Sequence, residues 1–140
     1  MKFDEPKNLE ILFSKAESLR NEGNFQDAID TFKIILKSKT NSTPVLNGIA
    51  NCYFQLNKFE LAEEYYILCL KNEPLNYTLI NNLSFLYLRT KNFKKALQML
   101  EKSHQIKGDQ ENIVEKIGYC LIEMKSYLQA VTFCENYLKK

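Results

Sequence analysis

The chain has 140 residues and a net charge of +2, with acidic and basic side chains interspersed, so no basic block predicts a nucleic-acid or anionic-membrane surface. Hydrophobic residues make up 45% of the sequence, with only 4 Gly and 3 Pro, which predicts a folded and mostly helical chain. No apolar stretch reaches the roughly 18 residues that a membrane span requires, so no membrane insertion is expected.

The amino terminus and the cysteines indicate the compartment. The first residues, MKFDEPKNLEILF, place acids and a proline where a secretory signal needs an uninterrupted apolar run, so a cytoplasmic protein is expected. The four cysteines show no Cys-x-x-Cys spacing, and the only histidine is His104. We therefore interpret the cysteines as small buried residues in a reducing compartment, and expect no metal and no other cofactor. These cysteines are Cys52, Cys69, Cys120 and Cys134.

Apolar residues recur three and four positions apart along the chain, on both sides of short polar breaks. This spacing is typical of amphipathic helices. Longer breaks contain Pro44, Pro74 and Gly108, residues that favour the first turn or the end of a helix. The sequence therefore predicts helix-turn-helix pairs with their internal turns near residues 21–24, 57–58, 91–92 and 125–126.

The pairs are copies of one pattern. An aromatic residue precedes an alanine by three positions in Phe25/Ala28, Phe59/Ala62, Phe93/Ala96 and Tyr127/Ala130, each pair lying 34 residues after the previous one. A column of small residues keeps the same step, at positions where two helices could approach closely: Ala16, Ala50, Ser84 and Gly118. Such a regular step indicates a repeat protein.

A 34-residue helix pair with these columns resembles the tetratricopeptide repeat. The turn glycine of that family survives only as Gly23 and its late proline only as Pro74, while its early tryptophan is replaced by Leu12, Leu46, Ile80 and Val114. The resemblance implies an all-α, right-handed α-solenoid of about eight antiparallel helices without a sheet. It also implies a single domain over residues 1–140, with repeats at about 9–42, 43–76, 77–110 and 111–140. The last repeat is slightly short, and no separate capping helix is expected.

The resemblance further implies a non-catalytic protein–protein interaction module, an adaptor or scaffold whose first helices line a concave groove. The groove is expected to bind a peptide or a helix of a partner protein. Asparagine can pair with a peptide backbone, and aromatic side chains can anchor apolar groups. The candidate residues are the first-helix side chains that point away from the core columns, with Gly48 on the same face: Asn47, Asn51, Phe54, Asn81, Asn82, Phe85, Arg89, Asn112, Lys116 and Tyr119.

One subset of the family grips the terminal carboxylates of chaperones with lysine, asparagine and arginine side chains. This chain matches that clamp at Asn51 and Asn82, but Asn47 and Asn112 stand where cations belong, and Lys116 replaces the arginine. Because a carboxylate needs charge-assisted donors, this ligand is disfavoured.

The alternative function uses the carboxyl end. The last helix should leave four apolar side chains partly exposed, which is typical of an interaction surface: Tyr127, Phe133, Tyr137 and Leu138. The chain would then be a self-associating scaffold or homodimer, a secretion-type chaperone, or the repeat part of a larger protein. Catalysis is not expected, because no phosphate loop, nucleophile elbow or helical metal-ligand pair occurs and His104 falls on a second helix. The location of the exposed apolar area distinguishes the two functions.

Overall fold

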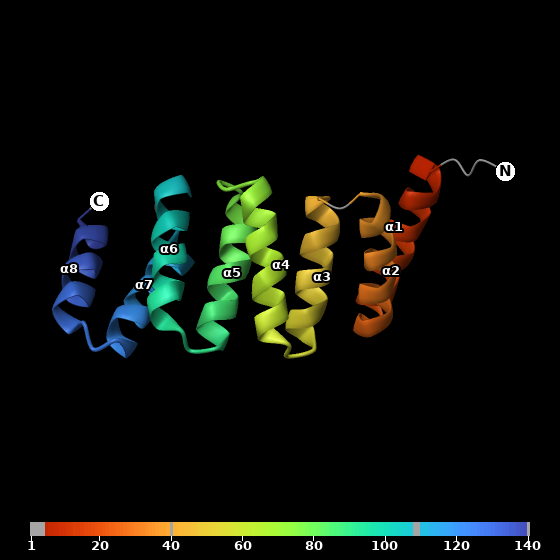
Figure 1. The fold of residues 1–140 in the computed structure, drawn as a ribbon. Helices are drawn as coiled ribbons and strands as arrows, with labels where there is room; N and C mark the ends of the chain where they lie inside the picture. Colours follow the sequence, from red (N-terminus) through yellow and green to blue (C-terminus); the bar gives the residue numbers. More distant parts are fainter. Residues whose placement is uncertain (1–4, 40, 108–109, 140) are drawn as a thin grey trace. The chain divides into compact units, whose positions relative to one another are not determined.

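The structure is a computed structural model that describes residues 5–39, 41–107 and 110–139 (Figure 1). Within these ranges the chain forms eight α-helices and no strand, which confirms the all-α prediction. In chain order the helices are α1 (Glu5–Asn21), α2 (Phe25–Ser38), α3 (Thr43–Gln55), α4 (Phe59–Asn72), α5 (Tyr77–Arg89), α6 (Phe93–Lys107), α7 (Glu111–Glu123) and α8 (Tyr127–Leu138).

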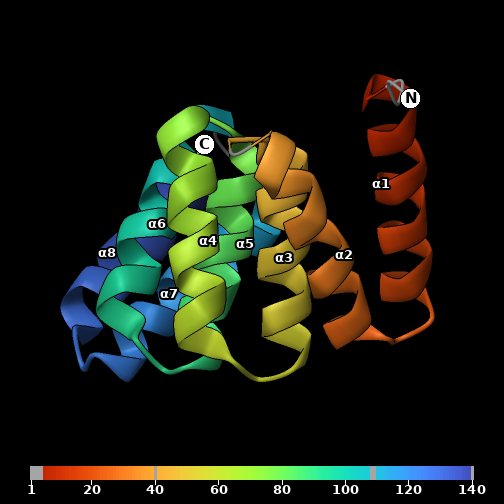
Figure 2. The ribbon, with the colours of Figure 1, turned by 45° about the vertical axis from the view of Figure 1, so that its right-hand side comes forward.

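The chain divides into two compact units, Met1–Pro74 and Leu75–Lys140. The first unit holds α1 to α4 and the second α5 to α8, so each contains two of the predicted helix pairs. In Figures 1 and 2 the second helix of each pair runs back beside the first, and α2 and α6 also pack against the first helix of the next pair in their unit. The prediction of one domain over the whole chain stays a prediction.

All four turns inside the helix pairs have the same backbone geometry. The second residue after each first helix has a left-handed φ, which is 85° at Gly23 and 60° at Asn57, Lys91 and Lys125. The next residue donates its N–H to a carbonyl five positions back, for example from Asn92 to Tyr87 at 2.8 Å. This is the Schellman arrangement, which caps the last carbonyls of the helix. The turn therefore keeps its form where glycine has been lost, although the left-handed conformation disfavours a side chain.

The repeat columns form the cores of the two units. The small column at 16, 50, 84 and 118 is buried throughout, and so is the alanine column at 28, 62, 96 and 130. The buried Ser84 hydroxyl donates to the Asn81 carbonyl at 2.8 Å, so its polar atom is satisfied within α5. The small column and the alanine column are thus part of the cores of the two units.

The expectation that Gly48 lies on the groove face is wrong. Gly48 is buried in α3, where a Cβ atom would lie only 2.6 Å from Cζ of Phe32. The Phe32 ring is fully buried and meets Phe13 edge to face, with 5.8 Å between the ring centroids. Glycine is needed here because α2 inserts this ring against the backbone of α3.

The interpretation of the cysteines as buried residues is confirmed for three of the four. All are free thiols, and Cys52, Cys69 and Cys120 are buried. Burial raises the pKa of Cys52 and Cys120 to about 11 and that of Cys69 to about 12, so these thiols stay protonated near neutral pH. Cys134 is exposed, contrary to the interpretation, because its side of α8 is not covered within the described chain.

Candidate peptide-binding surface

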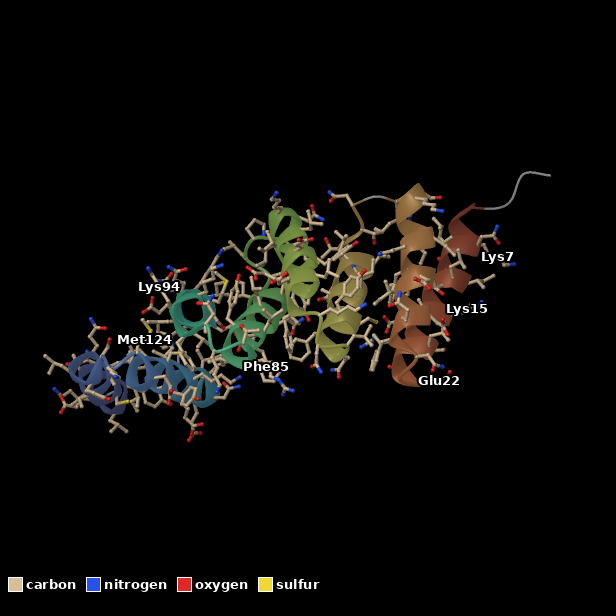
Figure 3. The ribbon with its side chains drawn as sticks, turned by 60° about the horizontal axis from the view of Figure 1, so that its bottom comes forward. Lys7, Lys15, Glu22, Phe85, Lys94 and Met124 are labelled. Carbon is tan, nitrogen blue, oxygen red and sulfur yellow. The ribbon has the colours of Figure 1, made fainter. Side chains whose placement is uncertain are left out.

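The clearest candidate for a binding surface is the first-helix face of the second unit, formed by α5 and α7. Phe85 and Tyr119 occupy equivalent positions one repeat apart, and half of each side chain is exposed. The Lys116 ammonium lies 5.9 Å from the ring centroid of Phe85, and Phe93 meets Tyr119 edge to face at 5.6 Å. Figure 3 shows Phe85 pointing away from the unit on the side opposite to Lys94 of α6. Neighbouring side chains thus hold two aromatic rings at the surface.

The polar residues on this face are not all equivalent. Asn81 is half-buried, and its Oδ1 accepts a hydrogen bond of 2.8 Å from the buried Ser103 hydroxyl of α6. The side-chain oxygen of Asn81 therefore links α5 to α6. Its side-chain NH2 group supplies the donors that a ligand could use. Asn82 is also half-buried, whereas Arg89 and Asn112 are exposed.

In the first unit, the corresponding face of α3 carries Asn47, Asn51 and Phe54, all half-buried. The Tyr66 hydroxyl of α4 donates to Oδ1 of Asn51, and burial raises the pKa of this phenol well above its usual range, so it remains a donor. Phe54 packs edge to face on Phe59, with centroids 5.5 Å apart. Asn51 and Phe54 thus hold α3 and α4 together, and all three side chains remain partly accessible.

The face of α1 is occupied by an ion pair, in which Nη2 of Arg20 lies 2.5 Å from Oε2 of Glu17. Both residues are half-buried and lie one helical turn apart. Because the Glu17 carboxylate and the Arg20 guanidinium already pair with each other, neither offers much net charge to a ligand. The main apolar side chain that α1 contributes to the first-helix face of the first unit is therefore Phe13.

The structure distributes the predicted groove residues between the two units. Seven of them lie on α5 and α7, and three lie on α3. Sequence reasoning missed Ile122 of α7, which is 51% exposed and occupies the same repeat position as Phe54. Continuing the Phe54 column by two repeats would have found it.

The first unit also has an open pocket of about 550 Å³ between α1, α2 and the start of α3 that the sequence did not reveal. Its apolar wall comes from Leu9, Phe13, Ile35 and Val45, while Glu10 and Lys39 stand among its polar residues. The pocket forms where the start of α1 meets its neighbours, and no sequence motif marks that place.

The predicted self-association residues lie on α8 in two different environments. Tyr127 is 58% exposed and Leu138 80%, whereas Phe133 and Tyr137 are half-buried. Phe133 packs edge to face on His104 of α6, with 5.9 Å between centroids. Sequence reasoning missed Leu128 and Val131, which are 80% and 52% exposed.

Two searches of the described residues bear on other kinds of site. No group of three or more histidine, cysteine or acidic side chains there is arranged to hold a metal ion. Likewise, none of the helices in those ranges combines the length and apolar character of a membrane span.

Comparison with known proteins identifies the repeat. Models of the tetratricopeptide repeat match residues 43–74 and 78–107. BBSome complex member BBS4 of Bos taurus is 25% identical over 100 residues, which cover 69% of this chain and 18% of that protein. The transcription factor tau 131 kDa subunit of Saccharomyces cerevisiae is 30% identical over 81 residues, covering 57% of this chain and 8% of that protein. The chain spans less than a quarter of the length of the curated relatives it matches.

Solved structures share the fold. A crystal structure of MamA protein has a TM-score of 0.83 and 19% identity, covering 96% of this chain and 73% of that chain. BtubC (BKLC) from P. vanneervenii has a TM-score of 0.80 and 20% identity, covering 99% and 65%. These similarities confirm the α-solenoid fold class.

The two matched segments coincide with the α3–α4 and α5–α6 pairs, and the remaining pairs carry the same columns at the same 34-residue step. The chain is therefore a tetratricopeptide repeat protein, a type of scaffold for protein–protein interaction.

Proposed function

We propose that this protein is a scaffold that binds a peptide segment or helix of a partner on the first-helix faces of its repeats. The observation that carries the proposal is the pair Phe85 and Tyr119, each half-exposed at the same position of consecutive first helices. Large aromatic side chains that remain accessible in a packed face are favourable anchors for a partner. Their shared repeat position supplies two anchor points for one ligand segment.

The surrounding side chains indicate the chemistry of the ligand. Arg89 and Lys116 stand on the same two helices as the aromatic pair. A segment with two apolar side chains and an acidic group would complement this face. The amide groups of Asn81, Asn82 and Asn112 can pair with the backbone of such a segment whatever its sequence.

The relatives support a place in a larger assembly. BBS4 is named as a member of the BBSome complex, and other relatives are named as subunits of transcription factor tau and of the anaphase-promoting complex. We propose a similar role as one part of a multiprotein assembly, without catalysis of its own. A cytoplasmic location suits the buried free thiols Cys52, Cys69 and Cys120, which persist in a reducing compartment.

The test selects ligands from a random peptide display library on the purified protein and measures their affinity by calorimetry. Truncating both anchors, Phe85→Ala with Tyr119→Ala, should weaken a selected peptide about 1,000-fold, since each hot-spot aromatic contributes about 2 kcal/mol and the two together about 4 kcal/mol. The matched control is Ile67→Ala with Ile106→Ala, which removes exposed apolar groups from second helices and should leave the affinity unchanged.

Three results would decide against this assignment. They are a library that yields no binder, peptides that bind the double variant as well as the parent protein, and equal loss in the control. A selection dominated by acidic carboxyl termini that depends on Asn82 and Lys116 would instead favour the carboxylate clamp.

A further inference from the structure

The second helix α4 carries an apolar stripe at positions that are mostly polar in the other second helices. Leu61 is 38% exposed and Leu68 is 40% exposed, and the half-buried Tyr65 lies between them at helical spacing. These three residues are called the α4 stripe. In the other helix pairs, the repeat positions of the two leucines hold Ile34 and five polar residues: Asp27, Lys95, Lys102, Gln129 and Asn136. Contact with water therefore does not call for leucine at these positions, whereas contact with a partner favours it.

The α4 stripe is joined to a cation on another helix of the first unit. The rings of Tyr65 and of Tyr53 on α3 lie 5.6 Å apart between their centroids. Nζ of Lys33 on α2 donates a hydrogen bond of 2.9 Å to the hydroxyl of the same Tyr53. Figure 2 shows α2 and α4 on either side of α3, and α3 packs against both. The contacts through Tyr53 therefore place an ammonium group beside the apolar stripe.

This ammonium group is available to a ligand. Lys33 is exposed, and among the residues that the structure describes it forms no ion pair. Asp30, one turn earlier on α2, accepts a hydrogen bond of 3.1 Å from Gln26 instead. An ammonium group has further N–H donors beyond the one that Tyr53 accepts. A carboxylate brought to this place by a partner would therefore find an unpaired cation.

We propose that the α4 stripe binds an amphipathic helix of another protein. The apolar seam of that helix packs along the stripe, and a carboxylate beside the seam pairs with Lys33. Backbone groups inside a helix such as α4 are already bonded to each other, so an extended segment could not add to them as a strand. A second helix presents apolar side chains at the same spacing of three and four residues. The cation favours a helix with an acidic residue at the edge of its seam.

The test begins with a selection that is directed away from the first-helix faces. The bait is the full chain with Phe85→Ala and Tyr119→Ala, which lacks the two anchors proposed for the peptide site. The library displays peptides of about 20 residues, long enough to form a helix. Selected peptides should repeat apolar residues three and four positions apart, with Asp or Glu beside them. A proline placed in the middle of a selected peptide should abolish binding, because it breaks the helix.

Calorimetry with the selected peptides then compares matched variants of the 140-residue chain. Leu61→Ala with Leu68→Ala should weaken binding about 30-fold, since covering the exposed part of each leucine raises the affinity severalfold. The control is Ile67→Ala with Ile106→Ala, which truncates side chains outside the stripe that are 39% and 37% exposed, and it should leave the affinity unchanged. Circular dichroism checks that each variant is folded.

A second comparison tests the charge. Lys33→Gln should weaken an acidic peptide about fivefold, as expected for an accessible ion pair. The same peptide with its acidic residue replaced by the amide should bind the parent protein and Lys33→Gln equally well. The control Lys94→Gln removes an exposed lysine from α6 and should change neither affinity.

Five results would overturn the proposal: a library that yields no binder, peptides that tolerate the central proline, peptides that bind Leu61→Ala with Leu68→Ala as tightly as the parent protein, an equal loss in the Ile67→Ala with Ile106→Ala control, and acidic peptides that are indifferent to Lys33→Gln. Because the bait lacks the anchors of the first-helix face, each of these results leaves the proposed peptide site untouched.

Discussion

Two glycines test whether the close helix contacts are real, because the same substitution should have opposite effects at the two sites. Gly48 lies within α3 and Gly118 within α7. Replacing glycine by alanine inside a helix usually stabilises it by about 1 kcal/mol, because the unfolded chain loses less freedom. The surroundings of the new methyl group decide whether that gain is kept.

The structure gives the size of each effect. At Gly118 the new Cβ would lie 3.7 Å from Sγ of Cys134, an ordinary contact, so Gly118→Ala should stabilise the protein by about 1 kcal/mol. At Gly48 it would lie 2.6 Å from Cζ and 2.8 Å from Cε2 of Phe32. That ring is fully buried, and overpacking of this kind costs about 1–3 kcal/mol. Gly48→Ala should therefore destabilise the protein by roughly 1 kcal/mol net.

Urea denaturation followed by circular dichroism measures both changes. The midpoint should rise for Gly118→Ala and fall for Gly48→Ala. Adding Phe32→Leu removes the ring, so Gly48→Ala should then cost less than it does beside phenylalanine, by about 1 kcal/mol in a double-mutant cycle. If Gly48→Ala raised the midpoint as Gly118→Ala does, the reasoning about the Phe32 contact would be refuted.

Three further predictions concern the turns and the thiols. Lys91→Gly should stabilise the protein by about 1 kcal/mol, because glycine adopts the left-handed conformation at this position without strain. Gln98→Gly in the middle of α6 should destabilise the protein by about 1 kcal/mol, and the urea midpoint measures both changes. Of the four thiols, Cys134 alone should react with a thiol reagent in the folded protein, and all four should react in denaturant. Folding stability should fall as pH rises from about 8.5 toward 11, because the unfolded chain releases the thiol protons before the folded chain does. A smaller fall in Cys52→Ala with Cys120→Ala would show that these thiols are the cause.

The repeat step was enough to predict part of the core. The small column and the alanine column each occupy the same place in every helix pair, and both are buried in all four pairs. The alanine column is buried in every pair, and the turn conformation recurs at Asn57, Lys91 and Lys125 although the glycine is lost. The spacing predicts helices and turns because it follows from the helical period and the length of one pair.

The candidate surface was less predictable because side chains pair across helices. Asn51 and Asn81 are asparagines on first helices, and composition alone makes them equivalent binding residues. The structure shows that Asn51 accepts a hydrogen bond from Tyr66 and Asn81 one from Ser103, partners 15 and 22 residues away. No spacing within one helix reveals such bonds, so the sequence overestimates how much of the asparagine face is available to a ligand.

The departures from the columns carry more functional information than the columns themselves. A column specifies a residue that suits burial between neighbouring helices, and α1 and α8 depart from the columns in different ways. In α1 the exposed Lys15 and Ser18 stand where α3 has the buried Ile49 and Cys52. In α8 Val131 and Leu138 keep an apolar character while more than half of each residue is exposed. The residue type at a column position therefore does not decide burial by itself, because burial also requires a neighbouring helix to pack against that position.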